Sequence, residues 1–367
     1  MDLDRIESAG SGRNKVSETD SAPSRFRTVR TTPAVIDLCC GLGGLSLASR
    51  QLGMAIIAGV DIGGDAVRTF SKNFPAAVAI ETTISGSKAV TQCKAALAKH
   101  GKAHSPLVVI SGPPCQGFSA AGTRDPKDKR NKVLLGVARA ISDLQPRFAV
   151  VENVQTLLTE KHRERVRDFQ QHLTDAGYHM LPVKLDAKDY GVAQKRERAF
   201  LLITQTPLDA KAIAARFVEL RQPEIPSGER LNDLPPAETR GAKYNDEEDA
   251  AGVYPNHLAM RHSSAVQKKI AAIKPGTGPM SYRKLDPTKP ANTLFSGHRA
   301  PPAHYAYPRS ITVREAARLQ GFPDDFRIYG SFANQMMQVT NAVPPPLART
   351  VLQVIAEVTG VPILEYA

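Results

Sequence analysis

The sequence lacks any run of about 18 consecutive apolar residues, the length that a membrane-spanning helix requires. Its first ten residues, MDLDRIESAG, also lack the apolar core of a secretory signal peptide. Only four cysteines are present, without CxxC spacing and with Cys39 and Cys40 adjacent, which fits neither a disulfide framework nor a zinc site. We therefore expect a cytoplasmic protein with reduced thiols, no membrane contact and no metal.

Acidic residues are nearly absent from one long stretch of the chain. Residues 261–309 hold nine Lys and Arg residues and one acid, Asp286, a net charge of +8 out of +12 for all 367 residues. Such a basic stretch favours a polyanionic partner. The overall composition, 42% hydrophobic and 23% charged, is that of an ordinary globular protein, and the length fits two or three domains.

Strands alternate with helices in the first 205 residues. Short apolar runs predict strands at 34–40, 55–62, 107–114, 148–154 and 198–204. Helical periodicity predicts helices at 45–53, 65–74, 133–144 and 164–177. This alternation predicts an α/β fold, a Rossmann-like, doubly wound and mainly parallel sheet covered on both faces.

Changes in composition predict the domain organisation. Residues 1–32 are polar and aperiodic, which predicts a disordered tail, and 33–205 form the first domain. Residues 206–307 are rich in Pro, Gly and charge and cannot continue the βαβ series, so we expect a smaller second domain there. Residues 308–339 then form a hinge segment with a helix, and the apolar segment 340–367 completes the first domain.

A glycine-rich turn follows the first predicted strand. GLGG begins at Gly41, and Asp61 ends the next strand 20 residues later, where a carboxylate can accept hydrogen bonds from ribose hydroxyls. This spacing predicts a nucleoside ligand, but it fits NAD as well as S-adenosylmethionine. A simple packing turn with a surface Asp is also compatible with it.

The segment GPPCQGFS places Cys115 at a strand end, behind two prolines that fix the backbone. The following residues, 120–132, contain five basic and two acidic side chains, and a positive field favours the reactive thiolate. That loop could equally be a solvated charge run.

Two further polar clusters flank predicted strands. FAVVENV puts Glu152 and Asn153 at the end of an apolar strand, where sites form in such sheets, although a helix-capping role is the simpler alternative. In QKRER, alternation puts Gln194, Arg196 and Arg198 on one face, suited to carbonyl, carboxylate or phosphate groups. A salt-bridged surface would give the same pattern.

Together these motifs resemble the cytosine-C5 DNA methyltransferase family. The segments DLCCGLGG, GPPCQGFS, ENV, QKRER, REAARLQGFPDDF and TNAVPPPLA occur in that family's order, over about residues 34–355. The resemblance implies a class I methyltransferase fold and transfer of a methyl group from S-adenosylmethionine to C5 of a flipped cytosine in a specific sequence of double-stranded DNA. It also implies that the enzyme acts as a monomer.

The resemblance implies roles for four catalytic residues. Cys115 attacks C6 of the cytosine and forms a covalent intermediate, and Glu152 hydrogen-bonds N3 and the exocyclic amine, for which a raised pKa is needed. Arg198, supported by Arg196 and Gln194, holds O2 of the base and the backbone of the flipped nucleotide.

For the cofactor, the resemblance implies contacts at the methionine end, the ribose, the adenine and the pocket closure. These residues are Leu38, Gly41, Leu42, Gly44, Asp61, Ile62, Ile84, Pro114, Asn341 and Val343. The chain departs from the family by having Cys39 for Phe, Asp61 for Glu and Thr83 for Asp, and by TNAVPP for GNSVPP. These departures predict that binding persists but is weaker.

The same resemblance makes 206–307 the target-recognition domain. Its basic stretch suits DNA phosphates, and Thr293-Leu294 looks like the marker of such domains. Candidate DNA-binding residues are Gln194, Arg283, Lys284, His298 and Arg299. We interpret Arg318 as structural.

Three alternatives stay open at this point. A tRNA cytosine-C5 methyltransferase would share the site, although the Cys-Phe-Thr insert of those relatives is missing. A Rossmann oxidoreductase explains only GLGG and Asp61. A DNA-binding regulator with a decayed site is the third, and the intact GPPCQGFS and ENV segments count against it.

Overall fold

The computed structural model describes residues 32–114, 131–241, 244–279, 282–295 and 301–364. The predicted tail, 1–32, lies outside these ranges except for its last residue. Within the described residues, one seven-stranded sheet has the order β3-β2-β1-β4-β5-β7-β6. Its strands are β1 (Ala34–Leu38), β2 (Ala55–Asp61), β3 (Val78–Glu81), β4 (Leu107–Ser111), β5 (Phe148–Val154), β6 (His179–Asp186) and β7 (Glu197–Thr204).

The sheet is parallel except around one strand. β3, β2, β1, β4 and β5 pair in parallel, whereas β7 runs antiparallel to both β5 and β6. The carboxyl ends of the five parallel strands therefore meet at one edge of the sheet. This arrangement confirms the predicted doubly wound, mainly parallel α/β fold.

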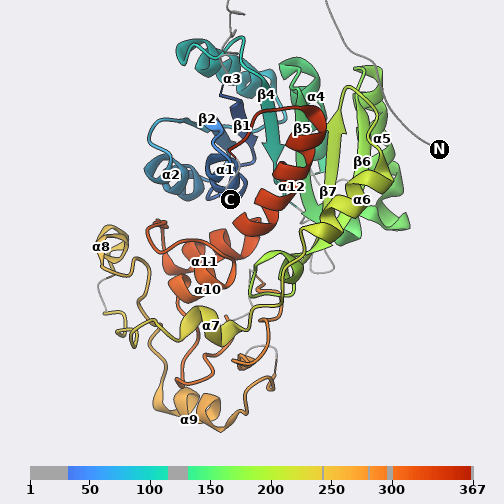
Figure 1. Cartoon of the computed structure of the whole chain (residues 1–367). Helices are drawn as coiled ribbons and strands as arrows, with labels where there is room; N and C mark the ends of the chain where they lie inside the picture. Colours follow the sequence, from blue (N-terminus) through green and yellow to red (C-terminus); the bar gives the residue numbers. More distant parts are fainter. Residues whose placement is uncertain (1–31, 115–130, 242–243, 280–281, 296–300, 365–367) are drawn as a thin grey trace, which may run out of the picture. The chain divides into compact units, whose positions relative to one another are not determined.

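Helices cover both faces of the sheet (Figure 1). The α-helices over the first 205 residues are α1 (Gly44–Gln51), α2 (Gly64–Asn73), α3 (Ser87–Lys99), α4 (Asn131–Leu144) and α5 (Arg163–Asp175). Later helices are α6 (Ala210–Glu219), α7 (Ser227–Leu231), α8 (Asp246–Ala251), α9 (Ser264–Ala272), α10 (Val313–Leu319), α11 (Phe332–Asn341) and α12 (Pro345–Thr359). Short 3-10 turns are η1 (Gln155–Leu158), η2 (Glu160–His162) and η3 (Ala187–Tyr190).

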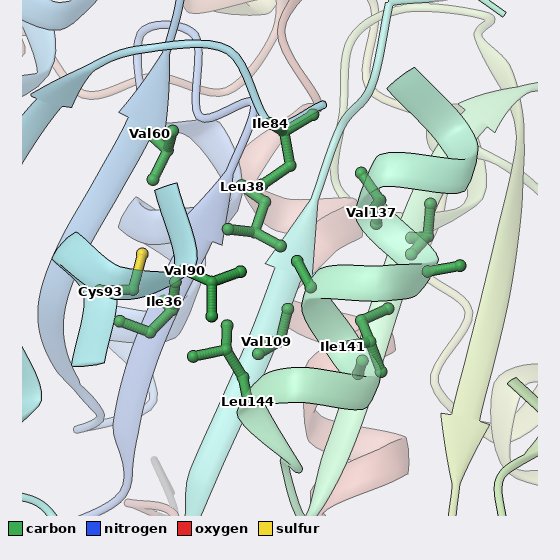
Figure 2. Packing of buried hydrophobic residues seen from close by; sticks show 14 of the residues in the cluster. Ile36, Leu38, Val60, Ile84, Val90, Cys93, Val109, Val137, Ile141 and Leu144 are labelled. Atoms are coloured by element: carbon green, nitrogen blue, oxygen red, sulfur yellow. The ribbon is translucent and has the colours of Figure 1, made fainter. Parts of the chain in front are cut away.

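Each face of the sheet has its own apolar core. On one face, α3, α4 and α5 pack on the strands, and Figure 2 shows Val90 and Cys93 of α3 meeting Ile36 of β1 and Val109 of β4. On the other face, α1, α6 and α12 supply the apolar side chains. Fully burying each such side chain contributes about 1.5–3 kcal/mol, so these two layers stabilise the sheet on which the strand ends are mounted.

A third core joins α2 to the later part of the chain. Phe70 of α2 and Phe74, directly after it, belong to one buried cluster with Leu285, Leu294 and Phe322. The cluster continues through α10 and α11. The boundaries of the second domain, 206–307, and of the hinge, 308–339, stay predictions.

The sequence pattern predicts no helix or strand in residues 76–106, where the structure has β3 and α3. It also leaves out β6. β3 is only four residues long, and β6 is an edge strand that contains Pro182 and several solvent-facing residues, so neither has a continuous apolar run. No helix in the described ranges combines the length and the apolar character needed to cross a membrane.

Candidate active site

The turn after β1 brings the backbone of two distant segments into contact. Cys39, Gly41 and Gly43 adopt positive φ angles of 60°, 54° and 101°, which turn the chain sharply from β1 into α1. A Cβ added at Gly44 would lie 2.2 Å from the carbonyl oxygen of Val343. Glycine at position 44 therefore permits the close approach of the GLGG turn to the TNAVPP segment.

Asp61, at the end of β2, holds two loops together. Its Oδ2 accepts a hydrogen bond from the Gly41 N–H at 2.8 Å, and its Oδ1 accepts one from the Gly63 N–H at 2.9 Å. Each carboxylate oxygen keeps a further lone pair, so the ribose contact stays open to Asp61. The second function of Asp61, fixing the GLGG turn against the start of α2, is not apparent from the sequence.

Asp37 is a buried carboxyl beneath the same turn. It begins the segment DLCCGLGG, but the sequence motifs predict no role for it. Burial raises the pKa of Asp37 to about 7, although the hydrogen bond that Ser46 Oγ donates at 2.6 Å lowers it. Its Oδ1 has no hydrogen-bond partner among the described residues. The Asp37–Ser46 bond ties the end of β1 to α1. An aspartate within the otherwise apolar run AVIDL is the signal that could have identified it.

Glu152 and Arg198 form a buried ion pair across neighbouring strands. β5 and β7 pair in the register Val154 opposite Arg198, and Glu152 Oε1 lies 2.9 Å from Arg198 Nε. The two side chains are only 8% and 12% exposed. Burial raises the pKa of Glu152 against the opposing effects of Arg198 and Arg196. A carboxyl that stays protonated more readily than usual can donate a hydrogen bond to a base.

Arg196 is buried beside this pair and crosses to the C-terminal segment. Its guanidinium nitrogen Nη2 donates to the carbonyl oxygen of Ala342 at 2.9 Å, and its backbone N–H donates to Asp186 Oδ1 at 2.9 Å. Arg196 thus links the entry of β7 to the segment that contacts the GLGG turn.

Gln194 points elsewhere. It is completely buried, and its Oε1 accepts a hydrogen bond from the Leu294 N–H at 3.1 Å. The neighbouring Thr293 Oγ1 donates to the Lys195 carbonyl oxygen at 2.7 Å. The Thr293-Leu294 marker therefore docks on the QKRER segment, and this position does not offer the Gln194 amide to solvent.

One cavity of about 600 Å³ unites most of the predicted residues. It is lined by Gly41, Leu42, Gly44, Asp61, Ile62, Ile84, Pro114, Glu152, Arg196, Arg198, Asn341 and Val343. Leu38 does not line it, because its side chain lies in the apolar core under α3 and α4 (Figure 2). Cys115 lies outside the described residues, directly after Pro114.

Of the other predicted DNA contacts, Arg283 and Lys284 lie within the described residues. Arg283 is exposed, whereas Lys284 is buried, with its Nζ 3.5 Å from the Ile270 carbonyl oxygen at the end of α9. His298 and Arg299 lie outside the described residues. Their roles in reading DNA stay predictions.

Sequence reasoning missed one whole wall of the cavity. Five residues of α11 line it, of which only Asn341 was among the predicted residues, and the first residues of α2, Asp65 among them, line it as well. The α11 residues are Asn334, Met337, Gln338, Thr340 and Asn341. Asn334, Met337, Gln338 and Asn341 follow the spacing i, i+3, i+4 and i+7 of a single helix face, a signal that could have found them.

The described residues include no group of three or more His, Cys, Asp or Glu side chains arranged to hold a metal ion. Of the described cysteines, Cys39, Cys40 and Cys93 are free thiols, and burial raises the pKa of Cys93 to about 12. These thiols are therefore protonated at neutral pH.

The seven-stranded sheet, with helices on both faces, is the α/β methyltransferase fold. At the carboxyl edge of its parallel strands lie the glycine turn, Asp61 and the Glu152–Arg198 pair. The family model for C-5 cytosine-specific DNA methylase matches residues 34–357, and the chain belongs to this family. The predicted family and its DNA cytosine-C5 methyltransferase activity are thereby confirmed, over both the tRNA enzyme and the oxidoreductase.

Individual relatives agree over most of the chain. M.DdeI of Desulfomicrobium norvegicum, a Type II methyltransferase, is 31% identical over 87% of this chain and 87% of its own length. M.XorII of Xanthomonas oryzae pv. oryzae, also a Type II methyltransferase, is 31% identical over 88% of this chain and 84% of its own.

Solved structures share the fold. A prophage-encoded E. coli protein, described as a DNA modification methyltransferase, superposes with a TM-score of 0.70 at 27% identity, covering 89% of this chain and 99% of that one. The Dnmt2 methyltransferase of S. pombe gives 0.61 at 14% identity, covering 88% and 98%, which shows the fold alone.

Proposed function

We propose that the cavity binds S-adenosylmethionine beside a flipped cytosine, and that Cys115, Glu152, Arg196 and Arg198 carry out the methylation of C5. The observation that carries this proposal is the Glu152–Arg198 ion pair, which opens into the same cavity as the Asp61-bound glycine turn. A carboxyl for the base and a nucleoside-type site for the cofactor are thus side by side.

The residues present fit the cofactor. A volume of about 600 Å³ falls within the range typical of small-molecule sites, roughly 300–1,000 Å³. Asp61 would hold the ribose, while Ile62 and Ile84 would contact the adenine. Ile62 is 75% exposed and lines the cavity, so its apolar side chain is open to a ligand there. When bound, S-adenosylmethionine supplies an activated methyl group.

At the end of the cavity assigned to the methionine part of the cofactor, two of the lining residues are glycines. Gly41 and Gly44 line the cavity, and Leu42, Pro114, Asn341 and Val343 enclose it. We keep Leu38 only as a residue that supports the turn from the core. The replacements Cys39 and Thr83 both line the cavity, so their effect on affinity is exerted directly at the ligand.

The chemistry on the base begins with a sulfur–carbon bond. The Cys115 thiolate adds to C6 of the flipped cytosine, and the electrons move to make C5 nucleophilic. Glu152 donates its proton toward N3 as the ring gains electron density, and Arg198 holds O2. After C5 has been methylated, a water molecule removes the C5 proton and the C5–C6 double bond re-forms. The C6–S bond breaks, Cys115 leaves as the thiolate, and N3 returns its proton to Glu152.

Extruding the base costs about a few kcal/mol of stacking and pairing, which contacts with the DNA backbone offset. We assign those contacts to the target-recognition region, residues 206–307, with exposed Arg283 as a candidate and with His298 and Arg299 from the sequence. We further propose that the enzyme works as a monomer in the cytoplasm, where its DNA substrate is found, and serves restriction-modification as the Type II relatives do.

The test is transfer of a tritiated methyl group to duplex DNA by the wild type and by Cys115→Ser. Transfer by the variant should be lost, because a hydroxyl is a far weaker nucleophile than a thiolate. A covalent adduct with 5-fluorocytosine DNA should form with the wild type alone. Undiminished transfer by Cys115→Ser would refute the thiolate mechanism, and a wild type that neither transfers nor traps would revive the non-catalytic regulator.

A further inference from the structure

The acidic run at 245–250 has no part in the proposed chemistry. Four consecutive acids, Asp246 to Asp249, form most of the short helix α8, in a chain whose substrate is a polyanion. Carboxylates placed near DNA would repel its phosphates. The structure instead directs two of them, Asp246 and Glu247, to a basic side chain of α2, within the described part of the chain.

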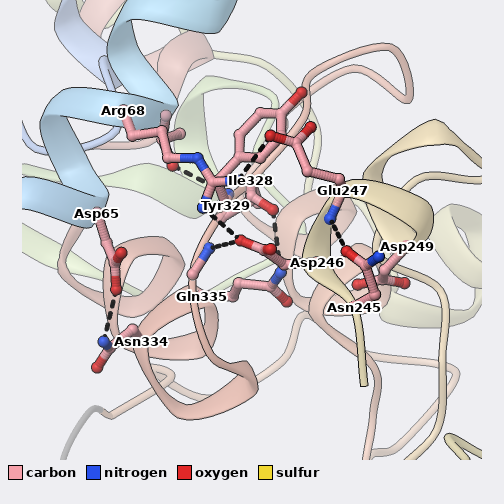
Figure 3. Close-up of polar contacts among 12 residues, drawn as sticks. Asp65, Arg68, Asn245, Asp246, Glu247, Asp249, Ile328, Tyr329, Asn334 and Gln335 are labelled. Carbon is pink, nitrogen blue, oxygen red and sulfur yellow. Dashed lines mark hydrogen bonds and ion pairs between the residues drawn. The ribbon is translucent and has the colours of Figure 1, made fainter. Parts of the chain in front are cut away.

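One carboxylate oxygen of Asp246 makes two contacts. Its Oδ2 lies 2.7 Å from Arg68 Nη1 (Figure 3). The same oxygen accepts a hydrogen bond from the Gly330 N–H at 2.6 Å. The Asp246 side chain is 20% exposed, whereas Glu247, which binds Arg68 Nη2 at 2.7 Å, is 51% exposed. Because exposed ion pairs contribute little, Asp246 is the stronger of the two connections.

Gly330, which Asp246 holds in place, packs against a residue that lines the cavity. Its φ is 109°, and a Cβ at this position would lie 2.5 Å from Asp65 Oδ2, so the backbone is packed directly against that carboxylate. Asp65 Oδ2 in turn accepts a hydrogen bond from Asn334 Nδ2 at 2.6 Å (Figure 3). Asp65 and Asn334 both line the cavity.

The network therefore joins three elements at the wall that the sequence analysis missed. Arg68 belongs to α2, whose first residues border the cavity, and Asn334 begins the cavity face of α11. The Arg68 guanidinium also stacks on the Tyr329 ring, with its central carbon 4.9 Å from the ring centre. Asp246 contacts both sides, α2 through Arg68 and, through Gly330, the segment that leads into α11, and it adds to the direct bonds of α2 with Asn334 and Tyr329.

We propose that Asp246 is a positioning residue for the cofactor, which holds α2 and α11 at the separation that the cavity requires. This inference rests on the proposed function, because it takes the cavity as the S-adenosylmethionine site. It assigns the acidic run of the predicted target-recognition region to cofactor binding and not to DNA. Residues along such packed networks alter binding through the geometry that they hold, without touching the ligand.

The experiment compares Asp246→Ala with Glu248→Ala in the full chain. Glu248 is exposed, lies in the same helix and makes no hydrogen bond or ion pair among the described residues. Each of the two variants removes one negative charge. Isothermal titration should show the Kd for S-adenosylmethionine raised about fivefold by Asp246→Ala and unchanged by Glu248→Ala. The Kd for duplex DNA should be the same for the two variants.

Further variants separate positioning from a general loss of structure. Asp246→Asn keeps an acceptor for Gly330 but loses the charge, so its Kd for S-adenosylmethionine should lie between those of the wild type and Asp246→Ala. In steady-state kinetics, the KM for the cofactor should rise while kcat stays within twofold of the control. If Asp246→Ala does not fold, Arg68→Lys provides the same test, with a smaller expected rise in Kd.

Two results would overturn the inference. One is a cofactor Kd for Asp246→Ala, or for Arg68→Lys, equal to that of Glu248→Ala. The other is a parallel rise of the cofactor and DNA Kd values with a lowered Tm, the signature of a loosened fold. Asp61→Asn keeps the two proposals apart: if it leaves cofactor binding intact, the proposed cavity is wrong, whereas weakened binding with Asp246→Ala unchanged refutes only the inference.

Discussion

His304 shows how a single side chain can be fixed in one protonation state. Its Nδ1 accepts hydrogen bonds from the N–H groups of Ala306 and Tyr307 at 3.0 and 3.3 Å, so this nitrogen carries no proton. Burial lowers the pKa of His304 to about 4, although Glu315, 3.6 Å from Nε2, raises it. Burial alone would raise the pKa of Glu315, but Arg309, bound through two nitrogens, lowers it.

We predict a histidine-dependent loss of stability in acid. A His whose folded pKa is about 4 and whose ordinary pKa is 6.5 binds fewer protons in the folded than in the unfolded state between these values. The contribution of neutral His304 to the free energy of unfolding, at most about 3 kcal/mol, is therefore complete above pH 6.5 and lost as the pH falls toward 4. Urea unfolding of the wild type and His304→Asn at pH 4.5 and pH 7 measures it.

His304→Asn isolates the titration of the histidine, because Asn offers an acceptor to the same two N–H groups but does not titrate. Asp37 and other groups remote from His304 are common to both proteins and cancel in the difference, whereas Glu315, which contacts His304, is part of what the substitution measures. Equal pH dependence of the free energy of unfolding in the two proteins would contradict the prediction.

Among single residues, those at strand ends were the easiest to predict. Asp61 and Glu152 follow apolar runs, and the register of a parallel sheet brings such ends to one edge. The wall formed by Asp65 and Asn334 was not predictable in this way, because their proximity depends on the path of residues 327–330 between helices far apart in the sequence. Gln194 was expected to face a ligand, and its contact with Leu294 arises only from tertiary packing.

At the scale of elements, the meeting of α1 with the segment before α12 is the tightest constraint on the site. We predict that Gly44→Ala destabilises the protein by about 1–3 kcal/mol and weakens cofactor binding. The added Cβ would lie 2.2 Å from a backbone oxygen of Val343, which cannot rotate away. Thermal unfolding and titration with S-adenosylmethionine check the two effects.

Gly86→Ala provides the matched control. Gly86 precedes α3 with a φ of −118°, and a Cβ there would meet nothing within 4 Å. This variant should stay within about 1 kcal/mol of the wild type, since alanine restricts the unfolded chain but is a poorer N-cap for α3 than glycine. If both variants behave alike, close approach at Gly44 is not what the glycine provides.

Long apolar elements were predictable from the sequence, and short or edge elements were not. β1, β4 and β5 are buried along nearly their whole length, so their runs are continuous. β6 alternates partly covered with exposed residues and is interrupted by Pro182, because it lies at the edge of the sheet. The position of β7 between β5 and β6 is a long-range property that no local pattern specifies.

At the scale of the whole molecule, the distribution of charge predicts how DNA binding responds to salt. The exposed Lys268 and Lys269 of α9 belong to the basic stretch 261–309. Replacing a lysine that contacts a phosphate with alanine should lower the slope of log K against log salt concentration by about 1. Fluorescence anisotropy with a DNA duplex, over a series of salt concentrations, measures the slope for Lys268→Ala and Lys269→Ala.

Lys94→Ala on α3 is the control, because Lys94 is equally exposed but lies outside the basic stretch. Its slope should match that of the wild type. If all three variants reduce the slope by the same amount, DNA responds to net charge alone and the stretch has no special role.

The apolar cluster that contains Phe70, Leu294 and Phe322 has a consequence for engineering. Grafting residues 206–307 from a relative, to redirect which site is methylated, would remove Leu285 and Leu294 from a core whose other half stays in the host. A successful chimera must therefore carry over these buried positions unchanged and vary only the solvent-facing ones. Sequence choice by this enzyme can evolve freely only on the outer side of that shared core.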